Sequence, residues 1–295
     1  MSSATLQGTP VASTPARQLL SRLWHEKPVG AAAALVFLLF VFCGVFADWL
    51  APYGFNEISM LERLKAPSWK HWFGTDNLGR DMLSRCLYGA QLSVIIGLSA
   101  ATLATTISVL IGLLCGYMGG KVDMVVQRIV DAYMSFPELV ILIAVVSVVG
   151  PGMPQIIGIL SLVLGIGGSR IIRSAVVSAR ENMYVHAAQS IGASTRRVLW
   201  YHLLPNIMPP IIVLFTTRVG AAILIESGLS FLGLGVPPPA PTWGGLLSGS
   251  GRTYMFQGPW LALAPGLCLT AVVYATNVFG DALRDLLDPR MRGAK

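Results

Sequence analysis

The sequence predicts an all-α integral membrane protein. Hydrophobic residues make up 54% of the chain and charged residues only 12%, whereas charged residues make up about a quarter of a soluble protein. The hydrophobic residues gather in runs long enough to cross a bilayer, which takes about 20 residues of helix. Only helices and closed barrels satisfy the backbone in lipid, and these runs are too long and too uniformly apolar for barrel strands.

Five apolar stretches are candidates for the spans. Four contain no Asp, Glu, Lys or Arg, and one is interrupted by Arg218 and Glu226. In chain order they are residues 28–47, 86–120, 139–169, 207–236 and 253–280. The first is too long for the apolar part of a signal peptide, so we expect it to remain as an anchor.

The third stretch predicts two crossings. It holds 31 residues, fewer than the roughly 40 that two spans need, and Gly150 and Pro151 near its middle indicate a turn. If one helix begins near Val125 and the next continues to Arg180, both have the required length. The chain then has six spans. One long kinked helix or a re-entrant hairpin is the alternative.

Lysine and arginine predict the orientation. If the chain has six spans, fourteen lysine and arginine residues fall on the side of the two termini and six fall on the other side. Basic residues collect on the cytoplasmic side, so we expect both termini in the cytoplasm and the chain in the plasma membrane. The net charge of +7 then reflects topology and contact with anionic lipid, and nucleic-acid binding is not expected.

This topology divides the chain into a membrane domain and two tails. The first tail is rich in Ser, Thr, Ala and Pro and is expected to be loose. The predicted parts are a cytoplasmic tail (1–28), a six-span domain (29–285) with an extracytoplasmic loop (51–85), and a cytoplasmic tail (286–295).

No motif in the sequence indicates covalent chemistry. Neither residues 74–81 nor residues 119–122 complete a P-loop. The four histidines form no metal-ligand pair at helical spacing, and no serine lies in G-x-S-x-G. The four cysteines lack C-x-x-C spacing and resemble small hydrophobic residues. We therefore expect no enzymatic activity, no metal site and no cofactor on this chain.

A polar segment, residues 183–204, separates the fourth and fifth predicted spans. Within it, Ala187, Ala188 and Gly192 lie near one another on a helix expected from about Met183 to Gly192. Side chains this small give another protein close access. The first half of the polar segment therefore predicts a docking surface.

The second half predicts another short helix. Ser194 is suited to cap its start. Pro205 is expected to stop it, with Leu204 in an extended conformation. The result is a helix-turn-helix on the cytoplasmic surface. An amphipathic connector anchored in the membrane interface by aromatic residues is the alternative.

The polar segment resembles the EAA coupling motif of bacterial ATP-binding-cassette (ABC) importer permeases. The residues that carry the resemblance are His186, Ala187, Ala188 and Gly192, followed by His202, Leu203, Leu204, Pro205 and Asn206. His186 stands where many members have glutamate. The resemblance implies that this helix-turn-helix, between spans 4 and 5, couples the chain to an ATPase through His186, Ala187, Ala188, Gly192, Leu204, Pro205 and Asn206.

Further runs resemble the C-type permease subunit of dipeptide, oligopeptide and nickel importers. They are residues 74–76 with 79–81, 116–120, 230–235, 241–244 and 280–285. The resemblance covers about residues 51–290 in the family's order. It implies four partners besides lipid: a B-type permease, two cytoplasmic ATPase subunits that bind ATP and Mg, and an extracytoplasmic solute-binding protein.

Arg218 and Glu226 are unusual because they lie inside a predicted span. An ionisable side chain in lipid costs a few kcal/mol unless it faces water or a partner, so both are expected to point into the protein interior. Eight residues separate them, about 12 Å along a helix, which is too far for an ion pair. Either they line the translocation path and meet a peptide, or polar groups on another span or subunit neutralise them.

The sequence thus predicts one half of a heterodimeric pore that imports small peptides with energy from separate ATPases. An importer of nickel or another small solute is the alternative within the family. A secondary transporter is an alternative of another class and predicts inverted repeats and interrupted helices. A purely structural membrane scaffold would leave the polar segment and the two buried charges without a purpose.

Overall fold

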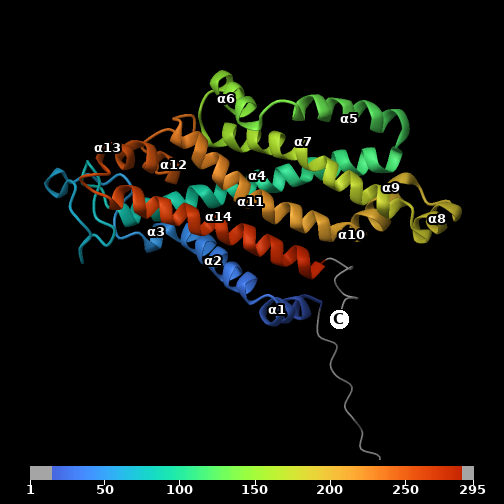
Figure 1. Ribbon diagram of the computed structural model, residues 1–295, viewed down its shortest axis with the longest axis horizontal. Coiled ribbons are helices and arrows are strands. Elements are labelled where there is room, and N and C mark those ends of the chain that lie inside the picture. The colour runs from blue at the N-terminus through green and yellow to red at the C-terminus, as the bar shows by residue number, and fades with distance from the viewer. Residues whose placement is uncertain (1–14, 288–295) are drawn as a thin grey trace, which may run out of the picture.

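The computed structural model describes residues 15–287, which form long helices and contain no β-strand. Five helices are long and apolar enough to cross a membrane. They are α2 (Pro28–Val45), α4 (Met82–Met118), α7 (Met153–Arg180), α11 (Met208–Phe231) and α14 (Trp260–Leu287). Figure 1 shows them running along the long axis of the molecule. The predicted all-α architecture is confirmed for the described residues.

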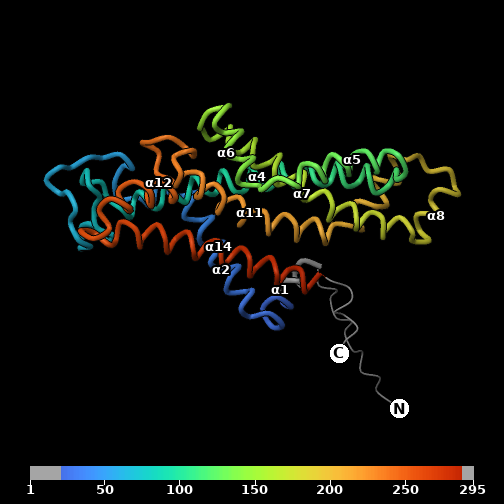
Figure 2. Tube along the Cα trace, turned by 45° about the horizontal axis from the view of Figure 1, so that its top comes forward, coloured from blue at the N-terminus to red at the C-terminus, as the bar shows by residue number. Residues whose placement is uncertain are grey.

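The stretch before α7 is broken. α5 (Gly120–Met134) and α6 (Glu138–Val149) are bent by 85° relative to each other, and Figure 2 shows α6 leaving the line of α5. The expected continuous helix from near Val125 is therefore wrong. Pro137 explains the break, because proline disfavours the helical conformation of Phe136 before it and has no N–H to donate. If the bent pair is one span, the chain has up to six.

The two ends of the molecule carry different connections (Figure 1). One end holds α8 (Met183–Ser190) and the following short helices. The other holds α3 (Ala47–Leu50), the loop after it and α12 (Trp243–Leu246). η3 (Leu247–Gly251), a π-helical turn, and α13 (Arg252–Tyr254) follow α12. α4 and α7 run in the same direction from the α3 side towards the α8 end, because α5 and α6 lead the chain back between them, whereas α11 runs in the opposite direction (Figure 1).

The N-terminal region is more ordered than predicted. α1 (Pro15–Glu26) forms where a loose tail was expected. Leu23 explains it, because this side chain is buried against Ala282 and Leu286 of α14. Lys27 adds an ion pair to Asp285, at 2.6 Å. Residues 1–14 and 288–295 lie outside the described residues, so the tail predictions for them stay predictions.

Glycines bring α4 and α7 into close contact. A Cβ atom built on Gly112 would lie 2.7 Å from Ile172 Cβ, and one on Gly116 would lie 2.7 Å from Val176 Cβ. Small residues four apart on one helix face allow two backbones to approach in a membrane, where dispersion contacts drive helix association. The same contact continues into a buried cluster at the α8 end.

The loop between α3 and α4 is built around Asp76, which is fully buried. Its carboxylate accepts hydrogen bonds from the backbone N–H groups of Leu78 (2.8 Å) and Arg80 (3.0 Å) and from Arg80 Nε (2.8 Å). Trp260 Nε1 donates to the Thr75 carbonyl at 3.1 Å and ties the loop to α14. The ordered turn predicted at residues 74–81 is confirmed.

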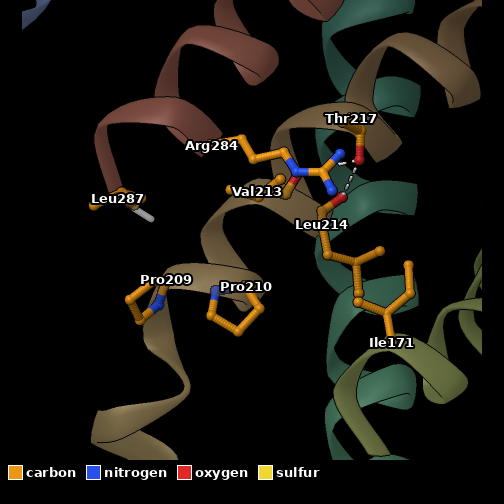
Figure 3. A pocket seen from close by; sticks show the side chains of 8 residues that line it. All are labelled: Ile171, Pro209, Pro210, Val213, Leu214, Thr217, Arg284 and Leu287. Atoms are coloured by element: carbon orange, nitrogen blue, oxygen red, sulfur yellow. Dashed lines mark hydrogen bonds between the residues drawn. The ribbon is translucent and has the colours of Figure 1, made fainter. Parts of the chain in front are cut away.

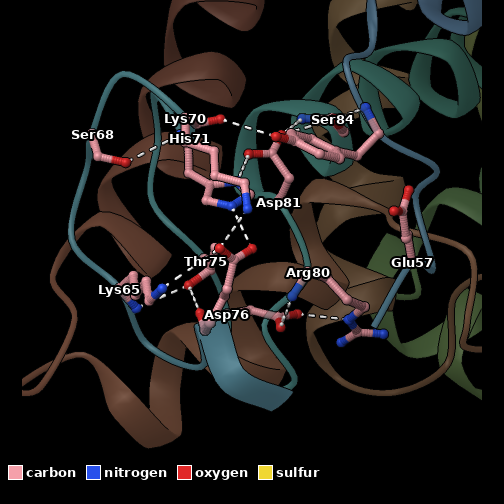
Figure 4. Close-up of polar contacts among 12 residues, drawn as sticks. Glu57, Lys65, Ser68, Lys70, His71, Thr75, Asp76, Arg80, Asp81 and Ser84 are labelled. Carbon is pink, nitrogen blue, oxygen red and sulfur yellow. Dashed lines mark hydrogen bonds and ion pairs between the residues drawn. The ribbon is translucent and has the colours of Figure 1, made fainter. Parts of the chain in front are cut away.

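His71 joins this loop to the start of α4 (Figure 4). Its Nδ1 lies 2.8 Å from Asp81 Oδ1, and its Nε2 lies 3.0 Å from Glu62 Oε2, at the end of η1 (Met60–Glu62). Asp81 also caps α4, because its other oxygen accepts from Ser84 N at 2.8 Å. Hydrogen bonds from Lys70 and His71 lower the pKa of Glu62 from 4.5 to about 2.

The first prediction tests the α4–α7 contact. Gly116→Val should destabilise the protein by about 1–3 kcal/mol, because the added side chain overpacks the interface. Gly158→Val on α7 is the matched control, since a Cβ atom there meets nothing within 4 Å. Thermal unfolding of the detergent-solubilised protein measures both. Equal melting temperatures for the two variants would show that the contact tolerates a larger side chain.

The second prediction concerns the pH dependence of the loop. Because the pKa of Glu62 is lowered on folding, its stabilising contribution is complete above about pH 4.5 and is lost as the pH falls towards 2. The difference in melting temperature between wild type and Glu62→Gln should therefore be larger at about pH 7 than at about pH 3. Glu57→Gln controls for the loss of a carboxylate nearby. A difference independent of pH would contradict the assignment.

Candidate functional site

The polar segment begins with α8, in good agreement with the predicted helix. The turn after α8 depends on Gly192, whose φ of +80° suits glycine. His186, Ala187 and Gly192 are exposed, as a docking surface requires. Ala188 is only 5% exposed, so its prediction as part of the open face is wrong. It lies one turn after the buried Val185 and faces the protein, where its small size permits close packing.

A second helical stretch follows, but it is longer than predicted. It consists of α9 (Thr195–Arg197), the π-helical turn η2 (Val198–Leu203) and α10 (Leu204–Asn206). Ser194 caps its start as predicted, since its hydroxyl accepts from Arg197 N at 3.4 Å. The predicted stop is wrong, because Leu204 has helical dihedral angles (φ −54°, ψ −47°). Pro205 lies in the first turn of α10, where a missing N–H costs little.

The polar segment is anchored to the ends of three long helices. Val185, Val198 and Leu203 are fully buried. They share one cluster with Leu113 of α4, Ile172 of α7 and Leu214 of α11. The half-buried Leu204 also packs against this cluster, whereas Pro205 and Asn206 are exposed. The polar segment therefore packs directly against the long helices.

The outer face of the polar segment exposes apolar side chains. Met183 is 87% exposed, Ile191 86% and Tyr201 77%. Such a patch at the end of a helical membrane protein is typical of a protein or membrane contact. Met183 and Ile191 were not predicted as part of the docking surface, although Ile191 directly precedes Gly192 and Met183 lies one helical turn before Ala187.

Glu226 is enclosed by this chain. It is 1% exposed, and its carboxylate accepts hydrogen bonds from Ser230 Oγ at 2.6 Å and from Ser227 Oγ at 3.4 Å. Both serines belong to α11. Within residues 15–287 no ion pair joins Glu226 to Arg218, in agreement with their spacing. In this conformation Glu226 is satisfied by its own helix.

Arg218 lies at a different place, in the wall of a cavity of about 330 Å³. Tyr133, Glu138, Val163 and Gly167 also line this cavity. The structure therefore brings Arg218 close to Glu138 and not to Glu226. Glu138 was not predicted as a site residue, because in the sequence it only bounds the apolar run that begins at Leu139. The proline immediately before it was the available signal for a helix start.

A larger cavity, of about 550 Å³, lies near the α8 end (Figure 3). It is lined mainly by apolar side chains such as Pro209, Val213 and Leu287, together with Arg284. Thr217 in its wall donates to the Leu214 carbonyl at 3.0 Å and is thereby satisfied. The polar chemistry of this cavity is thus limited to one cation.

Comparison with known proteins identifies the family. Residues 108–293, more than half of the chain, match the family model "Binding-protein-dependent transport system inner membrane component". The chain is 38% identical over 281 residues to the dipeptide transport system permease protein DppC of Alkalihalophilus pseudofirmus, which covers 95% of this chain and 92% of that protein. It is also 38% identical over 288 residues to the di/tripeptide transport system permease protein DppC of Pseudomonas aeruginosa, with 95% and 94% covered.

A third relative and one solved structure extend the comparison. The probable D,D-dipeptide transport system permease protein DdpC of Escherichia coli is 36% identical over 273 residues, with 92% of this chain and 91% of that protein covered. A chain of the MetNI methionine ABC transporter in inward-facing conformations has a similar fold, with a TM-score of 0.53, 18% identity, and 70% of this chain and 98% of that chain covered. The chain belongs to the family of binding-protein-dependent transport system inner membrane components.

Proposed function

We propose that this chain is the C-type permease subunit of an ABC importer and forms half of the translocation path for small peptides. The observation that carries the proposal is the similarity, over most of the chain, to relatives named for dipeptide and tripeptide transport. The second half of the path comes from a homologous B-type permease. Membership of a binding-protein-dependent transport family favours this importer over a secondary transporter.

The polar segment couples this chain to ATP hydrolysis on two separate ATPase subunits. The exposed Met183 and Ile191 fit an apolar cleft on an ATPase, and the exposed Ala187 and Gly192 allow its close approach. The buried anchors beneath them then carry the movement to α7 and α11. ATP and Mg bind to the ATPases, and this chain contributes motion between inward and outward access.

The membrane position follows from the same assignment. The α8 end lies in the cytoplasm with both termini, and α5 and α6 together make the sixth crossing. The loop between α3 and α4 faces the extracytoplasmic side, where a solute-binding protein delivers the peptide. Leu61 and Trp69 of this loop are 94% and 97% exposed.

The third prediction tests this orientation. In a cysteine-free variant expressed without the ATPase subunits, Trp69→Cys should react with a membrane-impermeant thiol reagent in intact cells, whereas Ile191→Cys should react only after the cytoplasmic side is opened. Both positions are highly exposed, unlike the native Cys86, which is buried. Labelling of Ile191→Cys alone in intact cells would reverse the orientation.

The fourth prediction tests coupling and import together. The complex with its partners, reconstituted in vesicles, should take up a labelled dipeptide only with ATP. Ile191→Asp should weaken retention of the ATPase about 10-fold or more, because it places a charge in an apolar contact, and should abolish uptake. The membrane domain should remain inserted, since Ile191 contributes little to its core.

Leu61→Asp is the matched control for this experiment. It places the same charge at an equally exposed apolar position at the other end of the molecule and should leave ATPase retention unchanged. Normal retention and ATP-driven uptake with Ile191→Asp would reject the docking surface. Uptake by the wild type without ATP would reject the importer itself.

A further inference from the structure

The cavity beside Arg218 lies halfway along the long helices. Arg218 is near the middle of α11, and Val163 and Gly167 are near the middle of α7. The bend between α5 and α6 brings Tyr133 and Glu138 to the same space. The volume of the cavity, about 330 Å³, is within the range of pockets that hold small molecules.

Two opposite charges face this cavity without pairing. Glu138 is close enough for an electrostatic attraction to Arg218, yet no ion pair joins them in the described part of the chain. Arg218 Nε and Tyr133 Oη are buried and have no hydrogen-bond partner within residues 15–287. A buried polar atom without a partner costs about 1–3 kcal/mol, so these atoms indicate a group that completes the site.

The local structure keeps the charges in place and leaves room between them. Glu138 lies in the first turn of α6, where the helix dipole favours a carboxylate. Gly168 makes space for the guanidinium, since a Cβ atom there would lie 3.3 Å from Arg218 Nη2. At Gly167 a Cβ atom would meet nothing within 4 Å. Two adjacent glycines on α7 thus keep one wall open.

We propose that this cavity binds a zwitterionic solute, with Glu138 accepting hydrogen bonds from its ammonium group and Arg218 donating to its carboxylate. Tyr133 supplies a further hydrogen bond from the hydroxyl. The inference rests on the proposed function and adds to it a substrate class: the permease itself recognises an unblocked peptide by its two charged ends. Glu226 takes no part, because its two serine partners already satisfy it.

The test uses the complete transporter complex without its binding protein, so that the preference of the binding protein does not enter. A dipeptide with a photoreactive side chain should crosslink to the end of α5 or to α6, α7 or α11. Excess unlabelled dipeptide should compete, whereas its N-acetylated and C-amidated forms should compete poorly. Glu138→Gln and Arg218→Gln should each lower labelling about 10-fold to 100-fold, since each removes a charge-assisted interaction.

Two glycine variants separate the cavity from the helix that carries it. Gly167→Leu should abolish labelling because the side chain enters the cavity. Gly158→Leu, on the same helix and equally without close neighbours, should leave labelling unchanged. Labelling that persists in Gly167→Leu, or equal labelling in both charge variants and wild type, would overturn the proposal.

Two further outcomes have distinct meanings. If the partner permease neutralises Arg218 and Glu138, the charge variants should reduce copurification of that subunit, and crosslinks should map elsewhere, which also overturns the proposal. Uptake is measured separately, with the binding protein added back, and if the wild-type complex then shows no ATP-driven peptide uptake, the proposed function fails. Normal uptake with crosslinks outside α5, α6, α7 and α11 would reject the zwitterion site alone.

Discussion

The close contact between α4 and α7 is the interaction on which the rest of the structure depends. Gly112 and Gly116 let the two backbones approach, and in lipid such a contact replaces the hydrophobic effect as the force that joins helices. α4 starts at the loop that contains Asp81, and α7 leads directly to α8. The pair therefore connects the two ends of the molecule with little freedom for one helix to slide past the other.

Much of the fold could be predicted, because the helices in lipid are set mainly by run length and by glycine and proline. α2, α4, α7 and α11 begin and end close to the predicted limits. The prediction failed where tertiary contacts decide the outcome. α1 forms because Leu23 finds a buried place beside α14, and the short helices before α14 form because Trp243 is buried with its Nε1 donating to the Cys86 carbonyl at 3.0 Å.

The candidate sites were predicted less completely, for a related reason. Composition and spacing identify the small residues. Which side of a short helix faces the protein, however, depends on the neighbouring helices. For this reason Ala188 was predicted on the exposed face, whereas it is buried. Pro205 was predicted to end the second short helix, because nothing in the sequence indicates the π-helical turn before it. Arg218 was recognised alone, whereas its neighbour Glu138 reaches the same cavity only through the bend between α5 and α6.

Asp81 belongs to two structural elements at once. One carboxylate oxygen caps α4 and the other faces His71, which in turn lies against Glu62. The free energies of these contacts are therefore not independent. The effects of substitutions at Glu62 and Asp81 on the free energy of unfolding should not be additive. In thermodynamic terms, the loop and the first turn of α4 form one cooperative unit that opens together, so local fraying at this end of the helix is suppressed.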